Sequence, residues 1–193
     1  MSALPQEIQD EIHHPIYDQI MLHAKGDPND YILAVILSSW LNKKGVLPQY
    51  MGLTVSDFNE LVNTHFPGFR VNERVRQDEE YSIERVPEVE DLLKLFNAHR
   101  ANLNRSELWV SQIITAACLG ANHLWQDLGL WNRNQLTNLI SYNFPSLAEK
   151  NNKNMKWKKF LYKQLCNEEG IFTCRSPSCE VCIDYAVCFG PEE

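Results

Sequence analysis

The chain has 193 residues, of which 44% are hydrophobic and 22% are charged, and its formal net charge is -7 at pH 7. This is the composition of a globular protein, and no apolar run approaches the roughly 20 residues that span a bilayer. The acidic net charge argues against nucleic acid as the main partner, because basic surface drives the binding of phosphates, but it does not forbid a local basic patch. The first residues, MSALPQEIQDEIHHP, lack a basic start and an apolar segment, so we expect no secretory signal and a cytoplasmic location.

Helical periodicity dominates the chain, and strand signals are scarce. The predicted helices cover residues 15–25, 30–42, 54–65, 87–102, 105–127, 133–143 and 154–167. Thr54 and Asn132 are typical helix N-cap residues, and Gln135 completes a capping-box pattern with Asn132. The sequence therefore predicts an all-α fold, a helical bundle without a sheet.

The predicted organisation is a helical domain followed by a cysteine-rich metal-binding tail. The proposed boundaries are 1–170 for the helical domain, 13–69 and 88–147 for an internal repeat, 70–87 for a charged linker, and 171–193 for the tail. The repeat pairs LPQYMGLTVSDFNELVNTHFPGF with LWQDLGLWNRNQLTNLISYNFPSL. We expect two similar three-helix units packed against each other. The alternative is a chance match of common helix-turn residues.

Four of the six cysteines crowd into the tail, in the sequence CRSPSCEVCIDYAVCFGPEE with the spacing C-x4-C-x2-C-x5-C. In a chain without an export signal, clustered thiols are more often metal ligands than disulfides. The candidate ligands are Cys174, Cys179, Cys182 and Cys188, and four thiolates are the usual ligand set of an iron–sulfur cluster. A structural zinc site is the first alternative, although it usually contains two separated pairs of cysteines. Disulfides are the second alternative.

The other two cysteines and the histidines are predicted to be structural. Cys118 lies in an apolar helix and is expected in the core, and Cys166 is expected to pack rather than to bind metal. The six histidines are His13, His14, His23, His65, His99 and His123. The repeat pairs His23 with His99, so these two are expected to face each other in the core.

The helix before the tail has a cationic face. Lys156, Lys159 and Lys163 share this face, with Lys158 close by, and apolar residues occupy the opposite side. One interpretation is an ordinary solvated surface. The functional interpretation is a positive field beside the metal site, which would attract an oxyanion or an acidic partner.

The tail and several N-terminal segments together resemble one known family. WKKFLYKQLC followed by the cysteine motif is similar to the C-terminal block of the NifQ family of nitrogen-fixation proteins. The four tail cysteines match that family's motif without a gap. HHPIYDQIMLHAKGDPNDYILA, LPQYMGL and HFPGF are similar to the first half of the family, and the charged stretch at 70–91 offers least to compare.

The resemblance implies a cytoplasmic metallocluster carrier that is not an enzyme. It implies a molybdenum–iron–sulfur cluster on Cys174, Cys179, Cys182 and Cys188, which supplies molybdenum for the iron–molybdenum cofactor of nitrogenase. The implied partners are the nitrogenase iron protein and the cofactor scaffold complex, with molybdate or a molybdenum–sulfur donor as the source. Neither nucleic acid nor a membrane is expected as a partner. If a histidine also binds molybdenum, His23 or His99 is the first choice.

Two other functions compete with this one. The C-x2-C-x5-C portion is also similar to the cluster loop of helical DNA glycosylases, but their first spacing is longer and no Gly-rich DNA-gripping hairpin is present here. A zinc-stapled interaction module, in which the metal only folds the tail, is the other alternative. A hydrolase or transferase has no support, because the GxSxG, P-loop and HExxH motifs are absent from the sequence.

Overall fold

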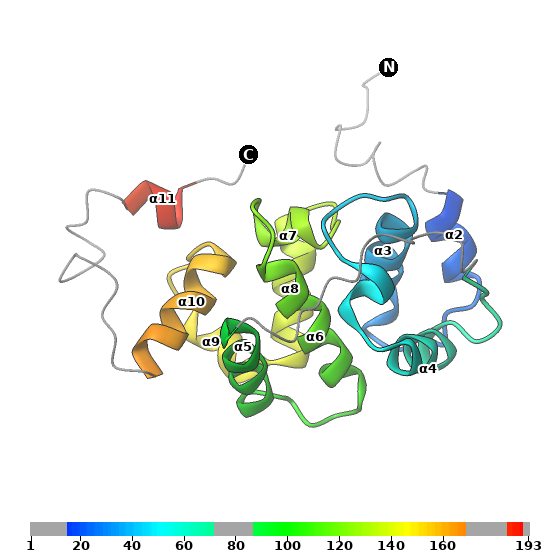
Figure 1. Ribbon diagram of the computed structural model, residues 1–193, viewed down its shortest axis with the longest axis horizontal. Helices are drawn as coiled ribbons and strands as arrows, with labels where there is room; N and C mark the ends of the chain where they lie inside the picture. Colours follow the sequence, from blue (N-terminus) through cyan, green and yellow to red (C-terminus); the bar gives the residue numbers. More distant parts are fainter. Residues whose placement is uncertain (1–14, 72–86, 169–184, 191–193) are drawn as a thin grey trace, which may run out of the picture.

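The computed structural model describes residues 15–71, 87–168 and 185–190, and within these ranges all regular elements are helices (Figure 1). They are α2 (Pro15–Met21), α3 (Asp30–Leu41), the 3-10 helix η1 (Gln49–Gly52), α4 (Val55–His65), α5 (Pro87–Ala98), α6 (Ser106–Cys118), α7 (Leu124–Asp127), α8 (Arg133–Asn143), α9 (Pro145–Lys150), α10 (Trp157–Glu168) and α11 (Tyr185–Phe189). The predicted all-α fold is confirmed for this part of the chain. No helix in the described ranges is both long enough and apolar enough to cross a membrane.

Two helices form the centre of the molecule. Most residues of α3 and of α6 are buried, including polar ones such as Ser38 and Ser111. A helix that is apolar almost all round is stable only when other helices surround it. The amphipathic helix α4 fits this arrangement, since it buries only Phe58, Leu61, Val62 and His65.

The N-caps were predicted correctly. The Thr54 side chain accepts a hydrogen bond from the Asp57 N–H at 3.1 Å, and the Asn132 side chain accepts one from the Gln135 N–H at 3.0 Å. The capping box is only half formed, because the Gln135 side-chain oxygen accepts from the Trp131 N–H instead of the Asn132 N–H. Each cap satisfies a backbone donor at the helix start that has no partner within the helix.

Positions that the sequence repeat pairs have matching conformations. Phe66 ends α4 with φ/ψ of -132°/60°, and Phe144 ends α8 with -137°/60°. Both phenylalanines are fully buried. Gly52 and Gly129 both have positive φ, 84° and 72°. The division of the chain into two units nevertheless stays a prediction.

Buried polar contacts connect segments far apart in the sequence. The side chains of Asn29 and Asn143 exchange two hydrogen bonds of 3.0 and 2.8 Å. The Ser39 hydroxyl donates to the carbonyl oxygen of Gly129 at 2.6 Å. A buried polar group that loses such a partner is costly, so these contacts specify how the two halves of the chain pack.

The single long helix predicted for residues 105–127 is wrong. The chain leaves α6 at Cys118 and begins the short helix α7 at Leu124. The Asp127 carboxylate accepts hydrogen bonds from the Asn122 N–H and the Asn122 side-chain amide, both at 3.1 Å. These contacts of the Asp127 carboxylate stabilise a turn where periodicity alone favoured a continuous helix.

Other boundaries also differ from the prediction. The first helix ends at Met21 rather than at residue 25, and α5 ends at Ala98 rather than at residue 102. Pro145 was interpreted as a stop signal, yet it occupies the first turn of α9. Proline is favoured there, because its fixed φ suits a helix and the missing N–H would have no partner within the helix.

Candidate functional site

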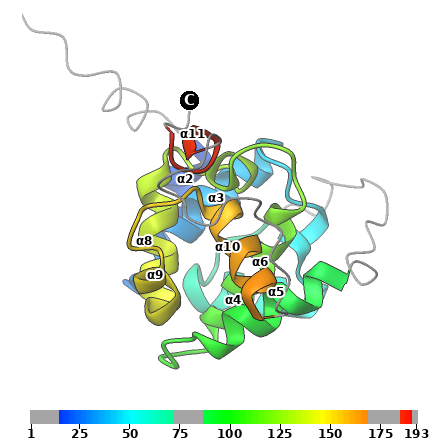
Figure 2. The ribbon, with the colours of Figure 1, turned by 90° about the vertical axis from the view of Figure 1, so that its left-hand side faces the viewer.

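Of the four predicted metal ligands, Cys188 lies in the described part of the chain. Cys174, Cys179 and Cys182 lie outside the described residues, so their arrangement stays a prediction. Cys188 is half-buried on α11, and together with Phe189 it packs against the hydrophobic core. Its carbonyl oxygen accepts a hydrogen bond from the Lys156 N–H at 2.8 Å. This bond holds the helix of the last cysteine beside the start of α10 (Figures 1 and 2).

A pocket of about 750 Å³ opens next to this contact. It lies between the start of α10, the segment that contains α7, and α11. Its lining residues are Ala121, Asn122, His123, Leu124, Gln126, Lys156, Lys158, Lys159 and Val187. Val187 directly precedes Cys188 in the chain. The pocket is therefore both rich in lysine and adjacent to a candidate metal ligand.

Lys158 is a fixed part of the pocket wall. Its ammonium group donates to the carbonyl oxygen of Gly120 at 2.8 Å and forms an ion pair with the fully buried carboxylate of Asp127. Gly120 is required here, because a Cβ atom at this position would overlap the Asp127 carboxylate and Val46. The charge of Lys158 is thus balanced by Asp127.

Lys156 and Lys159 differ from Lys158 in this respect. Lys156 is half-buried and Lys159 is exposed, and neither ammonium group has a hydrogen-bond or ion-pair partner among the residues that the structure describes. Lys163 does not line the pocket. The predicted cationic face is therefore divided: Lys156 and Lys159 line the pocket, and Lys163 lies outside it.

The prediction that Cys118 is a core residue is confirmed. The side chain is 4% exposed, and burial raises the pKa of its thiol to about 12, although the nearby charge of Lys158 opposes this shift. The thiolate is the form that binds metal and reacts, so a thiol with this pKa is inert near neutral pH. Cys166 is partly buried on α10, and its packing role stays a prediction.

We expect Cys118 to resist alkylation in the folded protein. With a pKa of about 12, only about one thiol in ten thousand is ionised at pH 8. Iodoacetamide labelling at pH 8, read by peptide mass spectrometry, should leave Cys118 unmodified until denaturant is added. Labelling of native Cys118 as fast as in the denatured protein would contradict its inert, buried state.

The predicted meeting of His23 with His99 is wrong. His23 Nδ1 lies 3.1 Å from the carbonyl oxygen of Pro67. His99 instead contacts the Ser146 hydroxyl through Nδ1 at 2.7 Å and the Lys150 ammonium through Nε2 at 3.0 Å. Each histidine packs on the Phe-Pro segment of its own half of the chain, so the repeat places them in equivalent positions rather than in contact.

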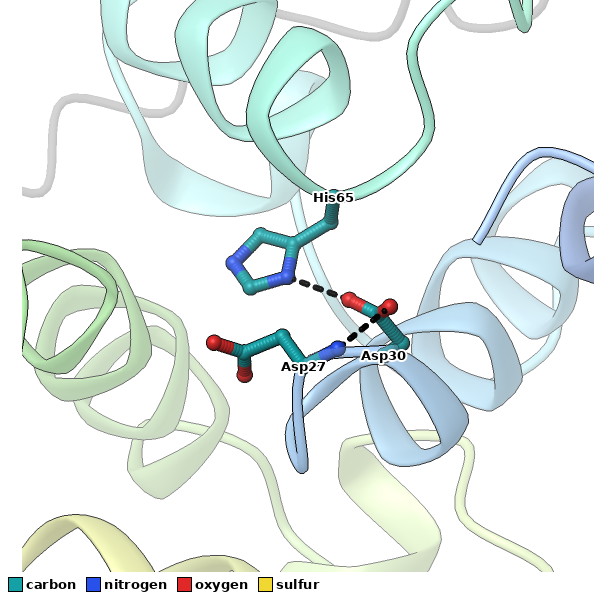
Figure 3. Close-up of side chains that lie close together, drawn as sticks. All are labelled: Asp27, Asp30 and His65. Atoms are coloured by element: carbon teal, nitrogen blue, oxygen red, sulfur yellow. Dashed lines mark hydrogen bonds and ion pairs between the residues drawn. The ribbon is translucent and has the colours of Figure 1, made fainter. Parts of the chain in front are cut away.

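A polar cluster that the sequence did not reveal lies in the core. Figure 3 shows Asp27 and Asp30 near the start of α3 and His65 at the end of α4, and one ligand atom from each lies within 4.8 Å of the others. His65 Nδ1 is 2.7 Å from the Asp30 carboxylate, and His65 Nε2 is 2.7 Å from the Ser106 hydroxyl. Histidine and carboxylate side chains in such proximity can bind a divalent metal.

The hydrogen bonds of this cluster favour a structural role over a metal site. Asp30 also accepts hydrogen bonds from the N–H groups of Gly26 and Asp27, at 2.7 and 2.9 Å. Both ring nitrogens of His65 are engaged, so a cation would displace contacts that already satisfy the buried groups. No sequence signal links these residues, because His65 is 35 positions from Asp30 and 41 from Ser106.

The order Asp30–His65–Ser106 is also that of a catalytic triad. In such triads the aspartate orients the histidine, which takes a proton from the serine as the hydroxyl attacks a carbonyl carbon. Here the three residues are 1–3% exposed, so a substrate cannot reach the Ser106 hydroxyl. The arrangement joins α3, α4 and α6 through buried hydrogen bonds.

In the described residues, the fold is all-helical and the site places a candidate thiolate ligand beside a basic pocket. The NifQ family model matches residues 32–190. The chain is 42% identical over 174 residues to Protein NifQ of Azotobacter vinelandii, which covers 85% of this chain and 89% of that protein. It is 33% identical over 171 residues to a Protein NifQ homolog of Sinorhizobium fredii, and this match covers 86% of this chain and 74% of that protein. No solved structure was found to match.

The chain therefore belongs to the NifQ family, which is implicated in nitrogen fixation. The resemblance seen in the sequence is confirmed. All four tail cysteines fall within the matched range, residues 32–190.

Proposed function

We propose that this protein carries molybdenum in a molybdenum–iron–sulfur cluster and supplies it for the iron–molybdenum cofactor of nitrogenase. The proposed ligands are Cys174, Cys179, Cys182 and Cys188. The observation that carries the proposal is the C-x4-C-x2-C-x5-C motif inside the range that the family model matches. Thiolates are soft ligands that suit iron–sulfur clusters, and four of them are the usual complement.

The proposed role is that of a carrier rather than an enzyme, acting in the cytoplasm. The proposed recipients are the nitrogenase iron protein and the cofactor scaffold complex. The surroundings of Cys188 suit a carrier, because this residue is only half-buried on a five-residue helix. A cargo that must be handed to another protein is released more readily from such a position than from a closed core.

Metal analysis with an absorption spectrum of anaerobically purified protein tests this proposal. We expect iron and molybdenum together, with a broad sulfur-to-iron absorption band that gives a brown colour. Iron without molybdenum would reduce the proposal to an iron–sulfur protein whose cargo must be shown by reconstitution. Zinc alone in a colourless protein would overturn it and indicate that the tail is a zinc-stapled module.

A further inference from the structure

We propose that the pocket between α7, α10 and α11 binds a small tetrahedral dianion through Lys156 and Lys159. The chemical class is an inorganic oxyanion or its sulfur analogue. The assignment of molybdenum as the central atom rests on the function proposed above, whereas binding of the dianion itself requires only the pocket. The two sources, free molybdate and tetrathiomolybdate, share this charge and shape.

The charge of the pocket is the first argument. The whole chain carries a net charge of -7, yet three lysines line one pocket. Asp127 balances one of them, and two ammonium groups are left without an acidic partner in the part of the chain that the structure describes. A dianion neutralises two such groups, and lysine ammonium groups bind oxyanions as compact point charges.

The wall of the pocket is the second argument. Asp127 would repel an anion if its carboxylate faced the pocket with free charge. Instead it is fully buried and receives hydrogen bonds from the Asn122 backbone and side chain, besides its ion pair with Lys158. Leu124 and Val187 contribute apolar surface to the lining and bring no competing charge to it. Lys158 is thus a positioning residue, and Lys156 and Lys159 supply the attraction.

The position of the pocket is the third argument. Val187 lines it and is adjacent to Cys188, and the Lys156 backbone is hydrogen-bonded to the Cys188 carbonyl. A dianion held there lies beside the segment that carries the last candidate ligand. The pocket would raise the local concentration of the molybdenum source where the thiolates bind it.

Isothermal titration of the full-length protein with molybdate, and separately with tetrathiomolybdate, tests the inference. Lys156→Gln and Lys159→Gln should each weaken binding by about tenfold, because each removes one charge-assisted contact. Lys163→Gln is the matched control: it removes the same charge from α10 outside the pocket, and the affinity of this variant should stay within about twofold of wild type. Circular dichroism checks that every variant is folded.

A variant with serine at all four tail cysteines separates this inference from the proposed function. We expect it to bind the dianion with near wild-type affinity although it holds no cluster. Wild-type affinity in both lysine variants, or no binding by the wild type, would overturn the pocket assignment even if the purified protein contains molybdenum. Equal loss in the Lys163→Gln control would also overturn it, since the effect would then be one of net charge. Binding of only one of the two dianions supports the inference and identifies the source.

Discussion

Replacement of Cys188 by serine is expected to abolish cluster loading while the helical fold remains. The same result is expected for serine at Cys174, Cys179 or Cys182. Loss of a group that merely supports a metal ligand typically costs about 10- to 100-fold in metal affinity, so the loss of a ligand itself should cost at least as much. Iron and molybdenum contents after anaerobic purification should therefore fall by at least about tenfold.

The structure indicates why Cys188→Ser should leave the fold intact. The contact that holds α11 to the start of α10 uses the backbone carbonyl of Cys188, and serine keeps that carbonyl. Serine is also close to cysteine in size, so the half-buried position needs no repacking. Far-UV circular dichroism should show unchanged helicity, which separates loss of the metal from loss of the structure.

Two matched controls complete this test. Cys118→Ala removes a thiol from the core, where burial keeps it protonated, so metal content should not change. Cys166→Ser probes a thiol on α10 that is predicted to pack, and wild-type metal content is expected there too. Full iron and molybdenum contents in all four tail variants would refute the assignment of these cysteines as ligands. A loss in Cys166→Ser comparable to that in the tail variants would add Cys166 to the ligand set.

Local sequence signals predicted the parts of the fold that depend on local interactions. Thr54 and Asn132 cap their helices through residues only three positions away, and both caps were predicted. The break between α6 and α7 was missed, because it depends on how Asp127 is buried and paired with Lys158, 31 positions further on. Apolar periodicity continues through this turn and cannot reveal a partner so distant.

The same distinction applies to the candidate site. The cysteine spacing and the lysine periodicity are local patterns, so both were visible in the sequence. The different roles of the lysines were not visible in the sequence, since they depend on the neighbours that folding brings to each side chain. Lys158 meets Gly120 and Asp127, whereas Lys163 falls outside the pocket. The buried network around His65 left no sequence signal for the same reason.

Replacement of His65 by leucine is expected to destabilise the protein by about 3–5 kcal/mol, because it leaves two buried groups without a hydrogen-bond partner and each such loss costs about 1–3 kcal/mol. Leucine is similar in size, so the cost arises mainly from the unpaired polar groups. One Asp30 oxygen and the Ser106 hydroxyl would both lose their 2.7 Å contact with the ring. For a chain of this length, Tm in a thermal melt should fall by about 10 °C.

Two further variants distinguish the ring's hydrogen bonds from a general effect of losing a histidine. His99→Leu removes a histidine that is only half-buried near the surface, so Tm should change by no more than about 2 °C. Asp30→Asn combined with His65→Leu should recover part of the stability lost in the single His65 variant. The double variant no longer buries a carboxylate charge that lacks its histidine partner.

The same melts decide between a structural network and a metal site at Asp27, Asp30 and His65. They are made in the variant with serine at the four tail cysteines, so that metal on the tail does not contribute. Because the ring nitrogens and the carboxylates already have hydrogen-bond partners, neither EDTA nor an added divalent cation should shift Tm. A ligand that binds the folded state raises Tm with its concentration. A rise with zinc or manganese that disappears in His65→Leu would therefore show that these residues bind metal, and the network would then be a second metal centre.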